Sequence, residues 1–158
     1  MEFTHLNDKG EAYMVNVGDK AVTARAATAC ATMRMRPATL DALQNGTLKK
    51  GDAIAAARIA GILAAKQTAA LIPLCHPIPI DSVTIDITPQ PPDCLRIVAF
   101  AHTTYKTGIE MEALTAASVA ALTVYDMCKA IDRSMAIENI RLLEKSGGHS
   151  GLWAAKTV

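Results

Sequence analysis

The sequence predicts an α+β fold: a four-stranded antiparallel sheet with helices on one face. Residues 83–87 alternate apolar and polar side chains, which is typical of a half-buried strand. The proline-rich turn 89–93 joins this strand to a second one over residues 95–104. Residues 53–70 and 109–131 are rich in alanine, the strongest helix former. With a strand at each end, the order is that of the split βαβ, or ferredoxin-like, fold.

The remaining elements follow from local signals. Residues 21–35, rich in Val, Thr and Ala, predict a first strand that Pro37 ends. A short helix over residues 37–45 begins with that proline, and Gly46 follows as its C-cap. Asp52 is placed to cap the first alanine-rich helix.

The second half of the chain predicts one further helix start and one further strand. Thr107 and Glu110 have the spacing of a capping box at the start of the long helix. The last strand, residues 135–143, leads into a glycine-rich tail. Because residues 95–100 are apolar on both faces, we expect another subunit to cover the second face of the sheet.

Composition narrows the class of protein. The 158 residues predict one domain, in which residues 1–18 and 145–158 are expected to be flexible segments that cover a substrate. With 51% hydrophobic residues and a net charge of +1, the chain is neither disordered nor a nucleic-acid binder acting through bulk charge. Four cysteines without a CxxC pair, no secretory signal and no membrane span predict a reduced, soluble, cytoplasmic protein.

A proline-rich loop carries the first candidate site residues. Pro73, Pro77 and Pro79 hold Cys75 and His76 on a rigid, non-repeating segment. Neighbouring residues of an extended chain point to opposite sides, so the two make a poor nucleophile–base pair. We favour a buried apolar role for Cys75, and leave functional and structural roles open for His76.

The long helix carries a heptad-spaced stripe that predicts a core face but includes charged residues. Asp126 and Lys129 form either an i,i+3 ion pair or an acid–base pair. Glu112 and Asp126 are fourteen residues apart, roughly 21 Å along a helix, so they cannot serve one small-molecule site within one chain. If both are catalytic, the site lies between subunits. The stripe consists of Glu112, Thr115, Val119, Leu122, Asp126 and Lys129.

Two lysine-containing segments have simpler explanations when taken alone. Lys49 and Lys50 before Asp52 are typical of a solvated turn. The tail that begins at Lys145 and continues through Gly147 could cradle a phosphate with its backbone N–H groups, or form a flexible end.

Two long motifs resemble the MoaC family of molybdenum-cofactor biosynthesis. They are Ala-Arg-Ile-Ala-Gly-Ile continuing to Leu-Ile-Pro-Leu-Cys-His-Pro over residues 57–77, and Lys-Thr-Gly-Ile-Glu-Met-Glu-Ala-Leu-Thr-Ala onward over residues 106–130. The likeness extends from Thr4 to Gly151. It implies a homohexamer, a trimer of dimers, with sites at subunit contacts. The implied substrate is 3′,8-cyclo-dihydro-GTP, made by a radical SAM GTP cyclase, and the products are cyclic pyranopterin monophosphate and pyrophosphate. No cofactor is certain, and Mg²⁺ with the triphosphate is left open.

The resemblance also implies roles for single residues. Asp126, Lys129 and Lys50 match the family's catalytic positions, and we expect Asp126 and Lys129 to face Lys50 and His76 of a neighbouring subunit. Arg25 and Lys145 match basic positions expected near the triphosphate. The implied substrate-binding residues are Leu74, Cys75, His76, Glu110, Met111, Glu112, Arg25 and Lys145.

Three positions depart from the family pattern: Asn16 replaces an aspartate, Tyr105 a small residue, and His149 a lysine. Asn16 cannot replace an aspartate that takes part in proton transfer. His149 in place of a lysine is expected to weaken the contact with phosphate. Two other classes of protein are alternatives to an enzyme. A non-catalytic ferredoxin-like module that binds a nucleotide or RNA needs exposed aromatics, which make up only 4% of the chain. The other class is a regulatory domain that senses a small molecule without turnover. Replacing Asp126 or Lys129 should abolish turnover in an enzyme and only alter ligand affinity in a sensor.

Overall fold

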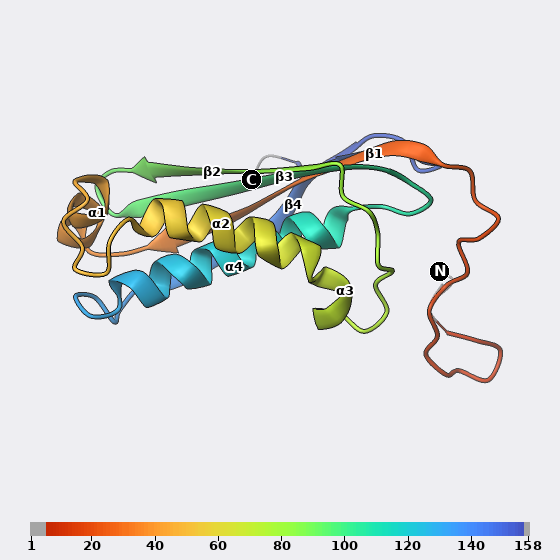
Figure 1. Ribbon diagram of the computed structural model, residues 1–158, viewed down its shortest axis with the longest axis horizontal. Coiled ribbons are helices and arrows are strands. Elements are labelled where there is room, and N and C mark those ends of the chain that lie inside the picture. Colours follow the sequence, from red (N-terminus) through yellow and green to blue (C-terminus); the bar gives the residue numbers. More distant parts are fainter. Residues whose placement is uncertain (1–5, 157–158) are drawn as a thin grey trace.

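The computed structural model describes residues 6–156 and contains a five-stranded antiparallel sheet with its helices packed on one face (Figure 1). The strand order is β2-β3-β1-β4-β5. The elements are β1 (Thr23–Arg34), α1 (Pro37–Gln44), α2 (Ala53–Lys66), α3 (Thr68–Leu71), β2 (Ser82–Gln90), β3 (Cys94–Tyr105), α4 (Glu110–Cys128), β4 (Ala136–Ser146) and β5 (Trp153–Ala154).

The predicted fold class is confirmed, with one strand added. β1 lies between β3 and β4 and is antiparallel to both, as the split βαβ order requires. The addition, β5, has two residues and pairs with the end of β4 through Lys145 and Trp153. So short a strand has no side-chain periodicity that could predict it.

The core lies between the sheet and the pair α2 and α4, which run across the same face (Figure 1). Gly61 allows the two helices to approach closely, because a Cβ there would lie 2.9 Å from the carbonyl oxygen of Ala116. The alanines of α4 face α2 and the sheet with almost no exposure. Close helix packing therefore gives α4 a well-defined place, and both of its ends carry candidate site residues.

Three details of the predicted helices are wrong. The helix predicted over residues 53–70 ends at Lys66, and a separate turn of helix follows as α3. The long helix ends at Cys128 rather than near residue 131. Its predicted capping box is absent: Ile109 is the N-cap, without a side-chain cap, and Glu110 makes an ion pair elsewhere. The predicted cap at Asp52 is confirmed, since its carboxylate accepts the Ala55 N–H at 2.9 Å.

The predicted core stripe of α4 is displaced around the helix by one position. Of its six residues only Glu112 is buried, and Leu122 is 57% exposed. The predicted stripe followed the larger side chains of α4. The side chains of α4 that contact the sheet and α2 are small, mainly alanines. The buried face consists of Ala113, Ala116, Ala117, Ala120, Ala121, Val124 and Cys128, together with Glu112.

The second face of the sheet carries no helix in the described part of the chain (Figure 1). On this face Phe100 lies opposite Thr28 and Thr84 on the two neighbouring strands, and it is 38% exposed. Cover by another subunit remains a prediction. Within residues 6–156, no helix is long and apolar enough to cross a membrane.

Candidate functional site

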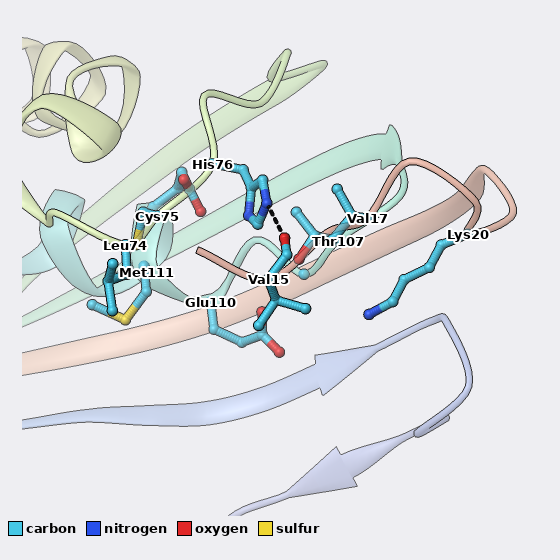
Figure 2. Close-up of a pocket in the computed structure, with 11 residues that line it drawn as sticks. Val15, Val17, Lys20, Leu74, Cys75, His76, Thr107, Glu110 and Met111 are labelled. Atoms are coloured by element: carbon cyan, nitrogen blue, oxygen red, sulfur yellow. Dashed lines mark hydrogen bonds between the residues drawn. The ribbon is translucent and has the colours of Figure 1, made fainter. Parts of the chain in front are cut away.

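A pocket of about 340 Å³ opens where α4 begins. Three segments surround it: residues 15–20 of the N-terminal region, the proline-rich loop at 74–76, and residues 107–112 at the start of α4 (Figure 2). The structure thus brings together every residue that the sequence placed on the loop and on the first turn of α4. These are Leu74, Cys75, His76, Glu110, Met111 and Glu112.

His76 joins the loop to the N-terminal segment. Its Nε2 lies 2.7 Å from the carbonyl oxygen of Val15, and the two groups point toward each other (Figure 2). A carbonyl can only accept, so Nε2 carries the proton and donates it. In the neutral ring Nδ1 is then the basic nitrogen. His76 therefore makes a structural contact through Nε2, while its functional role stays a prediction.

Glu112 is the buried acid of this pocket. It is 4% exposed, and burial, followed by the charge of Glu110, raises its pKa to about 7. A carboxyl group with such a pKa exchanges its proton readily near neutral pH. Burial and the neighbouring Glu112 also raise the pKa of the Cys75 thiol. Cys75 therefore stays protonated; it is half-buried and lines the pocket, so the fully buried role favoured for it is wrong.

A second pocket, of about 240 Å³, adjoins the first and contains both basic residues expected near the triphosphate. Lys145 Nζ lies 2.9 Å from Oε1 of Glu110, which links β4 to the start of α4. The Arg25 guanidinium donates to the carbonyl oxygens of Tyr105, at 3.1 Å, and Lys106, at 3.3 Å. These contacts hold two cations beside the opening of the first pocket.

A third pocket, of about 600 Å³, continues this basic region through Arg25, His149 and two lysines that sequence reasoning missed. Lys20 lines the first and third pockets, and Thr107 lines all three. Lys106 is hydrogen bonded to the carbonyl oxygen of Gly18 and so holds the N-terminal segment in place. The position of Lys106 directly before Thr107 and Gly108 could have identified it as a site residue. Lys20 lies in a segment without a periodic pattern, so there was no reason to select it from the sequence.

Asn16, one of the departures from the family pattern, shapes the same N-terminal segment. Its Oδ1 accepts the backbone N–H of Gly18 at 2.8 Å, which forms an Asx turn. Asparagine and aspartate both make this turn, so the substitution leaves the path of the segment intact.

A separate cluster lies at the other end of α4. Oδ1 of Asp126 is 2.6 Å from Lys129 Nζ, and Oδ2 is 2.9 Å from Lys50 Nζ. Lys50 also donates to the backbone carbonyl of Asp126 at 2.8 Å. The pKa of Asp126 is lowered to about 2, chiefly by its hydrogen bond with Lys129 and then by that with Lys50. The cluster is an exposed carboxylate held between two ammonium groups.

The two clusters belong to one chain but not to one site within it. α4 runs without interruption from Glu112 to Asp126, which keeps them roughly 21 Å apart at about 1.5 Å per residue. The structure corrects one pairing: Lys50 contacts Asp126 of its own chain, because the loop after α1 reaches the end of α4. His76 lies with the other cluster. Lys49 and Lys50 lie in an exposed turn before Asp52, as the solvated-turn interpretation predicts, and Lys50 reaches Asp126 from that turn.

Comparisons with known proteins agree with this arrangement of motifs. The sequence model of the MoaC family matches residues 14–148, most of the chain. The chain belongs to the MoaC family. MoaC relatives include cyclic pyranopterin monophosphate synthase of Herpetosiphon aurantiacus, 60% identical over 149 residues, which cover 94% of this chain and 91% of the relative. The protein named cyclic pyranopterin monophosphate synthase 3 of Mycobacterium tuberculosis is 60% identical over 94% of this chain and 84% of its own length. Cyclic pyranopterin monophosphate synthase of a Nostoc species is 58% identical over 94% of this chain and 89% of its own length. The likeness predicted at Thr4 lies outside the described residues.

Proposed function

We propose that this chain is a cyclic pyranopterin monophosphate synthase of molybdenum-cofactor biosynthesis. As a phosphorus–oxygen lyase, it would convert (8S)-3′,8-cyclo-7,8-dihydroguanosine 5′-triphosphate to cyclic pyranopterin monophosphate and pyrophosphate. Relatives of that name at about 60% identity support the reaction. One observation carries the proposal: the pocket that contains Glu112, whose pKa is raised to about 7, adjoins a region lined by basic residues.

The basic region suits the triphosphate. Arg25 and Lys145, assisted by Lys20, would bind its oxygens and stabilise the charge that develops on departing pyrophosphate. His149 lines the rim of the same region. The proposal needs no resident cofactor: Mg²⁺, where it accompanies the substrate, would be held by phosphate oxygens. A comparison of turnover with and without a chelator tests this point.

The first pocket suits the ring system. Leu74, Cys75 and Met111 provide apolar contact, while His76 and Glu112 provide groups that exchange protons. Ring opening and rearrangement require several proton transfers. Glu112, with a pKa of about 7, is populated in both protonation states under working conditions. Glu110 holds Lys145 and so connects the ring pocket to the triphosphate region.

The cluster of Lys50, Asp126 and Lys129 would complete the site from a neighbouring subunit. The separation of the two clusters along α4 supports this sharing. The resemblance to the MoaC family is the reason we propose a homohexamer, a trimer of dimers, as the active form. A lysine of this cluster can supply a proton as the ammonium, or remove one as the neutral amine, where the phosphate ring closes. Asp126 would then keep both lysines directed into the neighbour's pocket.

The cellular setting follows from the same chemistry. The substrate would come from a radical SAM GTP cyclase, which we propose as the functional partner. All four cysteines, Cys30, Cys75, Cys94 and Cys128, are free thiols, which supports a reducing compartment and hence a cytoplasmic location.

Turnover of the cyclised GTP derivative tests the proposal directly. The purified protein should release pyrophosphate and form the cyclic monophosphate, and Lys129→Ala should not. Lys66→Ala, which changes an exposed lysine at the end of α2, is the matched control and should keep wild-type turnover. Substrate binding without pyrophosphate release by the folded wild-type oligomer would contradict the proposal and favour a ligand sensor.

A further inference from the structure

Asp132, just beyond α4, is a buried carboxylate to which the proposed reaction gives no role. It is 2% exposed, each of its two oxygens accepts two hydrogen bonds, and Oδ1 also lies 3.4 Å from Nε of Arg36. Oδ2 accepts the backbone N–H of Arg36, at 2.9 Å, and the hydroxyl of Thr39, at 3.0 Å. Oδ1 accepts the backbone N–H of Ser134, at 3.0 Å, and its hydroxyl, at 2.6 Å. The carboxylate therefore joins the turn after α4 to the start of α1.

This contact gives α1 the cap that its own sequence lacks. Arg36 is the N-cap of α1 and makes no side-chain cap bond. The Asp132 carboxylate supplies a negative charge at that helix start, where it is favoured. Burial opposes its ionisation, but the hydrogen bonds from Arg36, Ser134 and Thr39 outweigh burial and lower its pKa.

Hydrogen bonds also connect α1 to the loop that carries Lys50. The backbone N–H and the hydroxyl of Thr47 both reach the carbonyl oxygen of Ala42, at 3.0 and 3.3 Å. The N–H of Gly51 then bonds the carbonyl of Leu48 at 3.0 Å. The loop that carries Lys50 is thus fastened to α1.

On its other side Asp132 is continuous with the last turn of α4. Its N–H bonds the carbonyl oxygen of Cys128 at 3.1 Å, and the N–H of Lys129 bonds that of Tyr125 at 2.8 Å. Asp126 and Lys129 therefore lie in the hydrogen-bonded turn 125–129, which continues directly into the turn 128–132 that ends at Asp132. Asp132 therefore lies between the α1 segment, whose following loop carries Lys50, and the end of α4, which carries Asp126 and Lys129.

We propose that Asp132 is a positioning residue: it fixes the α1 segment against the end of α4 so that the Lys50 ammonium reaches Asp126. A carboxylate is required because each oxygen accepts a backbone N–H, from Arg36 or from Ser134. Asparagine has one oxygen, so its amide NH₂ would face one of these two donors, and a buried donor would lose its partner.

The titration of Asp126 tests this without any assay of turnover. In Asp132→Asn, carboxyl-carbon NMR should show the pKa of Asp126 rising from about 2 toward its value in Lys50→Ala. Adding Asp132→Asn to Lys50→Ala should raise it no further. Asp41→Asn, which removes an exposed charge from α1 itself, is the matched control and should leave the Asp126 titration unchanged.

Kinetics give the second readout, which depends on the proposed function. Because a misplacement of about 1 Å can cost a factor of about 10² in rate, kcat of Asp132→Asn should fall about 10- to 100-fold with little change in KM. A folded Asp132→Asn protein in which Asp126 titrates as in the wild type would overturn the proposal and leave Asp132 a stabilising residue only. If the pKa moves but the wild-type protein shows no turnover, the positioning role stands and the proposed function fails.

If Asp132→Asn does not fold, Thr39 keeps the proposal testable. Thr39→Val removes one of the two bonds to α1 at nearly constant shape and should raise the Asp126 pKa by a smaller amount. Thr39→Ser restores the hydroxyl and should restore the low pKa. Identical Asp126 titrations in the Val and Ser variants would contradict the proposal.

Discussion

Replacing Glu112 with Gln tests the buried acid of the ring pocket through stability. Burial raises the pKa of Glu112 from 4.5 to about 7, so above pH 7 the native state holds a charge that it disfavours. Each unit of pKa is worth about 1.4 kcal/mol, and allowing for the open side of the pocket the full cost is about 2–3 kcal/mol. Glutamine resembles the protonated acid and avoids that cost.

The sign of the pH dependence follows from proton binding. Between pH 4.5 and 7 the native state binds the proton that the unfolded chain releases, so wild-type stability falls as pH rises. Glu112→Gln should therefore match the wild type below about pH 4.5, apart from a constant offset. Above pH 7 it should gain about 2–3 kcal/mol relative to that offset.

Urea unfolding of both proteins from pH 4 to 9, at one fixed protomer concentration, measures this difference. Fixed concentration matters because assembly stabilises the native state by mass action. Glu144→Gln, on the exposed part of β4, measures the effect of replacing a surface glutamate. A stability difference between wild type and Glu112→Gln that stays constant across this range would refute the assignment of a neutral-range acid.

Three further predictions concern the remaining site residues. Lys129→Ala should lose turnover by about 10²–10⁴-fold while substrate affinity, measured by calorimetry, is retained. Arg25→Ala and Lys145→Ala should instead weaken pyrophosphate binding and reduce its salt dependence, and unchanged binding would exclude a triphosphate role. Gly148→Ala should also weaken pyrophosphate binding, because its Cβ would meet Arg25 Nη2 at 2.9 Å. Gly151→Ala has a similar positive φ but open space around it, so equal losses in both variants would attribute the effect to backbone strain.

Strand β2 could be predicted from the sequence because it follows a period of two. Residues 83–87 alternate apolar and polar side chains, and the structure buries Ile85 and Ile87 while it exposes Thr84 and Asp86. The predicted helix boundaries are less accurate than the predicted strands. Alanine favours helix at every position, so it indicates neither which face of a helix is buried nor where the helix ends. The face of α4 was misplaced for that reason: its buried positions are mainly alanines, which contrast little with their neighbours.

Most residues that line the candidate site could be named from the sequence. Lys106 was missed, and neither Lys20 nor the contact of Lys50 with Asp126 could be predicted. Local spacing identified Glu112, Asp126 and their separation along α4. The contact of Lys50 with Asp126 joins residues seventy-six positions apart and depends on where α1 is fastened, which no local pattern encodes. Glu110 shows the same effect: its spacing fits a capping box, yet Lys145 of β4 competes for the carboxylate and holds it.

Mixing two inactive variants tests the central claim, that one site combines the two ends of α4 from different subunits. Glu112→Gln damages only the ring pocket, and Asp126→Ala only the lysine cluster. Each protein alone should be inactive, whereas co-assembled subunits should recover about one intact site in four by random pairing across an interface. No recovery of pyrophosphate release in verified hetero-oligomers, or full activity in a wild-type monomer, would contradict the account.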